Sequence, residues 1–267
     1  MDFIKKKILV VVKTYPNPSK QNQETVCVAG VLLENPHSWI RIYPVPFRDL
    51  PYEQQFKKYQ IIEAEIKKNR GDFRPESYKV NVDSIKILED VGRERNWERR
   101  KQYILPLVDS SMCKIQRERE DTQKSLGIFK PARVEDFIFK SGEKEWSDAD
   151  RNLLSQLKLF GNDKNILEKI PYKFKIKYKC LDLNCKGHFQ GIIDWETAQL
   201  YRNLKKKDRG STIIEKIKSK YLDDVCKKDK DFYFIVGNTL KGPKSFSIVG
   251  IFFPPKDDQL PLFDLES

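Results

Sequence analysis

The amino-acid sequence predicts an α+β protein with a β-rich N-terminal domain, a helical middle and a mixed C-terminal domain. Two observations predict this arrangement. Short apolar runs rich in β-branched residues, separated by Pro, Gly and Asn turn residues, fill residues 1–90. Apolar residues at helical spacing begin only after them. With 267 residues, of which 39% are hydrophobic, the chain is long enough to bury a sizeable core.

The N-terminal domain, residues 1–90, contains five apolar runs that we expect to be strands. Clusters of turn residues at 15–19 and 35–36 separate the first three runs. Several short strands at close spacing are typical of a small, mostly antiparallel β barrel or sandwich. The expected strands are residues 8–12, 25–33, 39–45, 59–68 and 79–88.

The middle of the chain, residues 91–170, is predicted to be a mostly helical, basic connecting region. Its clearest helix begins near Ser147, whose hydroxyl can accept a hydrogen bond from the first turn. Leu153, Leu154 and Leu157 then mark the side that would be buried. The region therefore carries helices whose charged faces point to solvent.

The C-terminal domain, residues 171–253, is predicted to return to strands around a helix. In residues 172–178, Lys alternates with aromatic residues or Ile, which is the period of a half-buried strand. A helix is expected to start at Asp194, because acidic residues favour a first helical turn. Two further apolar runs, 231–237 and 245–253, are joined by Gly and Asn turn residues and should pair as a hairpin.

The charge of the chain favours a polyanionic partner. Lys and Arg total 51 against 39 Asp and Glu, which gives a net charge of +12 and a predicted pI near 9.3. Nucleic acid is the usual polyanion inside a cell, and DNA is the expected form here. The basic residues gather in two clusters, and the candidate phosphate contacts are Arg99, Arg100, Lys205, Lys206 and Lys207. Trp97 and Tyr103 lie between the basic residues of the first cluster and either stack on exposed bases or pack in the core.

The last residues of the chain carry a short motif within a predicted flexible tail, residues 254–267. Gln259, Leu260, Leu262 and Phe263, with Pro261 between them, spell QLPLF. This resembles the peptide by which many bacterial DNA polymerases, repair factors and nucleases bind the sliding clamp. An apolar peptide of this kind needs large anchors close together to offset the entropy lost on docking. The resemblance implies recruitment to replication or repair, and the alternative is a C-terminal strand that packs on its own domain.

One group of residues has the composition of a metal site. Cys180, Cys185 and His188 have the spacing C-x4-C-x2-H, and thiolate and imidazole ligands suit zinc. A closed structural zinc site needs four ligands, so we expect the fourth to come from Cys226, Cys27 or Asp194. Without a metal, the group would be two half-buried thiols and a histidine beside the helix start.

A nuclease is the enzyme hypothesis that the sequence allows. Asp49, Glu65 and Lys67 resemble the metal-binding acids and the lysine of restriction-like nucleases, although the usual Pro before the Asp is missing. No phosphate-binding Gly-rich loop, nucleophile elbow or dinucleotide fingerprint occurs in the sequence. Three hypotheses remain open: a clamp-recruited DNA-binding accessory protein, a metal-dependent nuclease, and an RNA- or protein-binding module without catalysis.

The expected compartment is the cytoplasm. The sequence contains no long apolar run and no cleavable leader pattern, so no membrane partner is expected. Five scattered cysteines, an odd number, do not predict a disulfide framework. The oligomeric state cannot be read from these patterns.

Overall fold

The structure, a computed structural model, describes residues 2–19, 23–159, 167–226 and 230–256. Its first part is a closed barrel of five strands, in the order β1-β5-β6-β4-β3, which β1 closes by pairing with β3. Neighbouring strands are antiparallel except β4 and β6. The strands are β1 (Ile4–Lys13), β3 (Gln23–Leu32), β4 (Ser38–Val45), β5 (Gln60–Lys68) and β6 (Ser77–Asp90), and a short β2 (Asn17–Ser19) extends the sheet beyond β3.

The barrel forms because one side of each strand is apolar. Ile8 of β1, Ile42 of β4 and Ile62 of β5 are buried together in its interior. Two 3-10 helices, η1 (Phe47–Asp49) and η2 (Tyr52–Gln54), connect β4 to β5, and η1 adds Phe47 to the same core. The apolar runs predict a small barrel or sandwich, and the structure confirms the barrel.

The second part is a seven-stranded sheet with strand order β7-β8-β12-β13-β11-β10-β9. The predicted hairpin of the last two strands is confirmed, since β12 and β13 pair in antiparallel fashion. The strands of this sheet are β7 (Val108–Asp109), β8 (Leu126–Phe129), β9 (Pro131–Ser141), β10 (Tyr172–Cys180), β11 (His188–Ile192), β12 (Tyr233–Asn238) and β13 (Phe246–Phe252).

The middle of the chain is helical only in part. The helices α1 (Glu94–Ile104), α2 (Met112–Thr122) and α3 (Asp148–Leu159) lie there, together with the 3-10 helix η3 (Leu105–Leu107). Strands β7, β8 and β9 come from the same stretch and are built into the C-terminal sheet. Of these, β8 pairs with β12 and β9 with β10, strands that come later in the chain, and local periodicity does not reveal such pairings.

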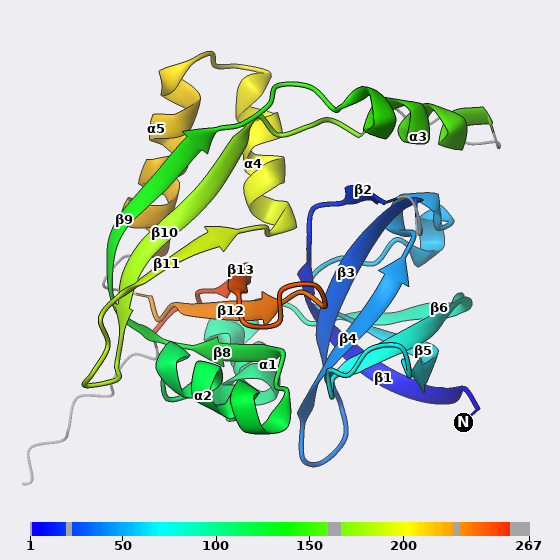
Figure 1. Cartoon of the computed structure of the whole chain (residues 1–267). Coiled ribbons are helices and arrows are strands. Elements are labelled where there is room, and N and C mark those ends of the chain that lie inside the picture. Colours follow the sequence, from blue (N-terminus) through cyan, green and yellow to red (C-terminus); the bar gives the residue numbers. More distant parts are fainter. Residues whose placement is uncertain (1, 20–22, 160–166, 227–229, 257–267) are drawn as a thin grey trace, which may run out of the picture.

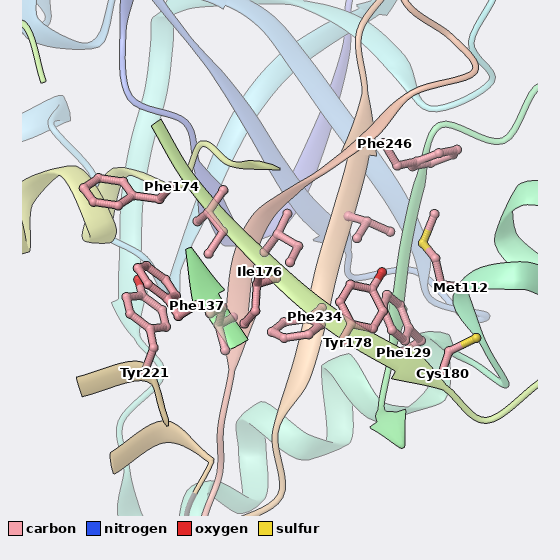
Figure 2. Close-up of a cluster of buried hydrophobic side chains, with 14 of the residues drawn as sticks. Met112, Phe129, Phe137, Phe174, Ile176, Tyr178, Cys180, Tyr221, Phe234 and Phe246 are labelled. Carbon is pink, nitrogen blue, oxygen red and sulfur yellow. The ribbon is translucent and has the colours of Figure 1, made fainter. Parts of the chain in front are cut away.

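One face of the C-terminal sheet is covered by helices. The helices α4 (Trp195–Lys205) and α5 (Ser211–Ser219), followed by the π-helical turn η4 (Lys220–Val225), lie beside β9 and β10 (Figure 1). The aromatic core under them runs from Phe137 and Tyr221, which stack with ring centroids 4.8 Å apart, to Tyr178 and Cys180 (Figure 2). Met112 and Ile115 of α2 bury against the other end of the same core.

The opposite face of the sheet is covered by the barrel over only part of its width. Ile235 of β12 and Val249 of β13 pack with Leu9 and Val11 of β1, and α1 adds Trp97 to this cluster. Arg74 is buried in the connection between β5 and β6 of the barrel. Its Nη1 donates to the carbonyl of Asn238 in β12, 2.9 Å away. None of the residues that the structure describes in β9, β10 or β11 belongs to this apolar cluster between the barrel and the sheet. Among the described residues, no helix is both long and apolar enough to cross a membrane.

Candidate metal centre and lysine face

Four ligand groups converge at the tip of the β10–β11 hairpin. Cys180 is the last residue of β10 and His188 the first of β11, while Cys185 lies in the turn between them. Cys113, in the first turn of α2, reaches the same point from the neighbouring helix. The four ligand atoms all lie within 4.8 Å of one another.

The distances among three of these atoms, those of Cys113, Cys180 and His188, match the edges of a tetrahedral ion site. Zn–S bonds of about 2.3 Å and Zn–N bonds of about 2.0–2.1 Å predict edges of about 3.8 Å between two sulfurs and about 3.5 Å between sulfur and nitrogen. The Sγ atoms of Cys113 and Cys180 are 3.6 Å apart. The Nε2 atom of His188 lies 3.5 Å from Cys113 Sγ and 3.4 Å from Cys180 Sγ. The cluster could hold a metal ion, and its Cys₃His donor set is compatible with zinc.

The surroundings orient the ligands. The backbone N–H of Gly187 donates to Cys185 Sγ at 3.4 Å, and Gly187 has the positive φ of +97° that the tight turn requires. The imidazole of His188 stacks on Tyr178 with centroids 5.0 Å apart. Burial lowers the pKa of His188, against a smaller opposing effect of Asp182. A lowered pKa favours the neutral imidazole, which is the form that binds a metal.

The fourth ligand predicted from the sequence is wrong. Cys113 takes that place instead of Cys226, Cys27 or Asp194. Cys27 Sγ accepts a hydrogen bond from Arg41 in the barrel, 3.1 Å away, and Asp194 is buried at the start of α4. Cys113 precedes Cys180 by 67 residues, so no local spacing connects them. The nearest sequence signal is Ser111, two residues earlier, which caps α2 and indicates a helix start but not a ligand.

A second feature begins at this hairpin and follows β10. Lys173, Lys175, Lys177 and Lys179 alternate with the buried residues of the strand and therefore share the face turned away from the helices. Directly opposite them, Phe189 on β11 pairs with Lys177 and Lys140 on β9 pairs with Lys173. We call this surface the lysine face; it comprises Lys140, Lys173, Lys175, Lys177, Lys179 and Phe189.

The charges of the lysine face are mostly unneutralised. Lys177 forms an ion pair with Glu135, which is shared with Arg133. The described part of the chain gives Lys140, Lys173, Lys175 and Lys179 no carboxylate within 4.0 Å. Phe189 is 48% exposed, and Lys175 Nζ lies 4.6 Å from the centroid of its ring. The face thus combines free cations with an exposed aromatic ring.

The first basic cluster predicted from the sequence is only partly on the surface. Trp97 and Arg100 are 8% and 7% exposed, in the core between barrel and sheet. The Arg100 guanidinium lies 4.0 Å from the ring centroid of Tyr59, and its Nε donates to the Val91 carbonyl at 2.7 Å. Trp97 and Arg100 therefore present no open face to a ligand in this structure. Tyr103 is half-buried, with its ring centroid 5.5 Å from that of His37.

The remaining predicted basic residues lie at the surface. Arg99 pairs with Glu89 at 3.0 Å, and Lys205 pairs with Glu168 at 2.7 Å. Lys206 and Lys207 are exposed just beyond α4, where positive charge also stabilises the helix end. Three of these five cations thus already have a carboxylate partner or lie in the interior.

The residues of the nuclease hypothesis are distributed over the barrel. Glu65 of β5 accepts a hydrogen bond from Asn81 at 2.9 Å, and Lys67 lies over the ring of Phe3. Asp49 belongs to η1. Among the described residues, the group of three or more potential metal ligands is the Cys/His cluster, which contains neither Asp49 nor Glu65. The predicted clamp-binding residues Gln259, Leu260, Leu262 and Phe263 lie outside the described residues.

The boundary between two family matches coincides with the boundary between the two parts of the structure. Residues 4–106 match a family described as Domain of unknown function (DUF8758), and residues 108–267 match one described as Domain of unknown function (DUF8757). Because the second match spans more than half of the chain, the protein belongs to the DUF8757 family. The division falls at the end of η3, between the barrel with α1 and the C-terminal sheet.

Other comparisons give little beyond this. A solved structure described as a murine DNA binding protein bound with ds DNA is similar at 10% identity and a TM-score of 0.29, covering 97% of this chain and 98% of that chain. No curated protein matches the chain.

Proposed function

We propose that the protein binds nucleic acid, with the phosphate backbone held along the lysine face. The observation that carries this proposal is the row of four lysines on β10, of which Lys173, Lys175 and Lys179 have no carboxylate within 4.0 Å among the described residues. Cations that have no protein partner bind phosphates and release the counterions that surround a nucleic acid. The net charge of +12 adds a long-range attraction for the same ligand.

The geometry of the face supports a strand of nucleic acid as the ligand. Residues two apart on a β-strand are about 6.7 Å apart, so the row from Lys173 to Lys179 spans about 20 Å. Measured along the helix axis of B-form DNA, that length corresponds to about six phosphates of one strand. Phe189, exposed beside the row, offers a ring on which a base can stack.

The metal centre has a structural role in this proposal. A Cys₃His site with four protein ligands leaves no open position for a substrate. Bound zinc would join α2 to the tip of the β10–β11 hairpin, since Cys113 comes from the helix and the other three ligands from the hairpin. The strand that carries the lysines would then be fixed at one end.

The C-terminal peptide supplies recruitment in the same proposal. If Leu260, Leu262 and Phe263 bind the sliding clamp, a modest tail affinity raises the local concentration of the protein at DNA, and the two contacts reinforce each other. Avidity of this kind does not require catalysis. The nuclease alternative gains no support from the surroundings of Glu65 and Lys67, which are engaged by Asn81 and Phe3.

Fluorescence polarisation with labelled single-stranded and duplex DNA and RNA tests the proposal. We expect binding that weakens steeply with salt, because several phosphate contacts are made. The strand type that binds most tightly identifies the natural ligand. Absence of salt-sensitive binding to all four probes would refute the proposed function.

A further inference from the structure

A pocket lies at one end of the lysine face. It has a volume of about 390 Å³ and is bordered by the start of β10 and the end of β11. Lys173 and Lys175 belong both to the lysine face and to the lining of the pocket. Sites for small ligands usually have volumes of about 300–1,000 Å³, so the size suits a compact organic group.

Three aromatic side chains from separate parts of the fold form much of its wall. They are Tyr15, just after β1, Trp146, just before α3, and Tyr172 of β10. The Tyr15 hydroxyl donates to the Glu168 carbonyl at 2.6 Å, and the Trp146 indole N–H donates to the Leu167 carbonyl at 2.7 Å. The polar atoms of Tyr15 and Trp146 are therefore already satisfied, and what these two side chains offer to a ligand is apolar ring surface.

The lining of the pocket includes both cations and a buried carboxyl group. Lys173 and Lys175 bring positive charge, and the described residues give neither an ion pair. Asp194 also lines the pocket and is only 4% exposed. Burial, followed by the charge of Glu196, raises the pKa of Asp194 to about 7. Near neutral pH its carboxyl group can thus donate or accept a hydrogen bond.

We propose that this pocket binds one nucleotide, with its base among the aromatic rings, its ring nitrogens hydrogen-bonded to Asp194, and its phosphate on Lys173 and Lys175. The nucleotide can be one unit of a bound strand, with its base turned out of the stack, and in that case the inference rests on the proposed function. A free nucleotide presents the same chemistry. Stacking walls, a buried hydrogen-bonding group and paired cations are together what a nucleotide requires.

Gly191 provides a variant that fills the pocket without removing a charge. It lines the pocket, and a Cβ atom there would meet its nearest neighbours, the Phe174 carbonyl oxygen and Ser247 Oγ, at 3.9 and 4.0 Å. These are ordinary contacts, so Gly191→Leu should fold with its side chain in the pocket. Gly71→Leu, in the loop after β5 and outside the lining, is the matched control, since its nearest neighbour would be Asn69 Oδ1 at 3.6 Å. Asp194→Asn is a second, nearly isosteric variant.

The experiment compares a short single-stranded oligonucleotide with the same backbone made of abasic units, by fluorescence polarisation. Since stacking of one base is worth about 5- to 150-fold in affinity, we expect the full-length protein to prefer the intact strand by at least about fivefold. Gly191→Leu should abolish the preference while abasic binding is unchanged, and Gly71→Leu should keep it. Thermal melting verifies that each variant is folded.

A second arm titrates nucleoside monophosphates by calorimetry. Binding that is lost in Gly191→Leu assigns the pocket to free nucleotides as well, whereas a base preference without such binding restricts it to strand units. Equal affinity for intact and abasic strands together with no monophosphate binding would overturn the inference, as would a preference that survives in folded Gly191→Leu. If neither strand binds, the lysine-face proposal fails. Monophosphate binding alone then shows whether the pocket binds a nucleotide.

Discussion

The Sγ atom of Cys113 lies 3.6 Å from that of Cys180, although 67 residues separate them in sequence. This contact joins the start of α2 to the end of β10, and Cys185 and His188 complete the cluster. Free thiols at these distances gain little from one another, because S–H groups are weak hydrogen-bond donors and acceptors. A shared metal ion would explain why the fold brings all four together.

The metal centre gives the first prediction. We expect the purified protein to contain one equivalent of zinc by mass spectrometry of the metal content, and Cys113→Ser to lose it. Because structural zinc contributes directly to folding, the free energy of unfolding should fall by more than about 4 kcal/mol. Cys226→Ser, which changes a cysteine outside the cluster, should leave both values unchanged. Full zinc occupancy in Cys113→Ser would contradict the assignment.

The buried arginine between barrel and sheet gives the second prediction. Arg74 forms an ion pair with Asp72 at 2.6 Å, and both side chains are buried. Removing the guanidinium in Arg74→Ala leaves the carboxylate buried without its cation, which costs about 3–5 kcal/mol. Urea unfolding should show this loss, whereas exposed Arg70 can be replaced by Ala for about 0.5 kcal/mol or less. Equal stability of the two variants would show that the pair does not hold the two parts together.

The pH dependence of stability gives the third prediction. Burial raises the pKa of Asp194 from 3.8 to about 7, so between these values the folded state binds more protons than the unfolded state. Stability from this group is therefore fully present below about pH 4 and is lost as the pH rises through about 7. At about 1.4 kcal/mol per pKa unit, the loss should be a few kcal/mol.

Comparison with Asp194→Asn isolates this effect, because the amide does not titrate. We expect urea unfolding of the native protein to weaken between pH 5 and pH 8 more than that of the variant. Parallel pH profiles for the two proteins would mean that the carboxyl group is already ionised at pH 5. Titrating groups that do not interact with Asp194 contribute equally to both profiles and cancel, whereas Glu196 and Lys58, whose charges act on Asp194, do not.

The C-terminal peptide gives the fourth prediction. A protein that ends after Pro255, or that carries Leu262→Ala and Phe263→Ala, should lose binding to a bacterial sliding clamp in surface plasmon resonance. Its affinity for nucleic acid should be unchanged, because the lysine face lies in another part of the chain. Clamp binding that persists after truncation would remove recruitment from the account and leave the nucleic-acid proposal standing.

The sequence predicts the barrel well because its signals are local. Each strand has its own apolar run, and turn residues separate the runs. The C-terminal hairpin of β12 and β13 is predicted for the same reason. The order of the larger sheet is not predictable in this way, since β8 and β9 pair with strands that come much later in the chain.

The candidate sites, too, were predictable where their residues are close in sequence and not where they meet only in the fold. Three metal ligands are close in sequence and were predicted, whereas Cys113 joins them only through the packing of α2. From the sequence alone Arg100 is expected to be a surface cation, but in the fold it contacts the Tyr59 ring and the Val91 carbonyl in the interior. The alternating lysines of β10 predict a strand. Whether they can bind a ligand depends on which face of the sheet the barrel leaves uncovered, and the sequence does not show this.

The salt dependence of nucleic-acid binding in two charge-matched variants tests the central claim most directly. Lys175→Gln with Lys179→Gln removes two charges from the lysine face, and Lys79→Gln with Lys86→Gln removes two exposed charges from β6 of the barrel. If the lysine face holds the phosphates, the first pair should reduce the slope of log affinity against log salt by about 2 and the second should leave it unchanged. Equal slopes for the native protein and the Lys175/Lys179 variant would contradict the account.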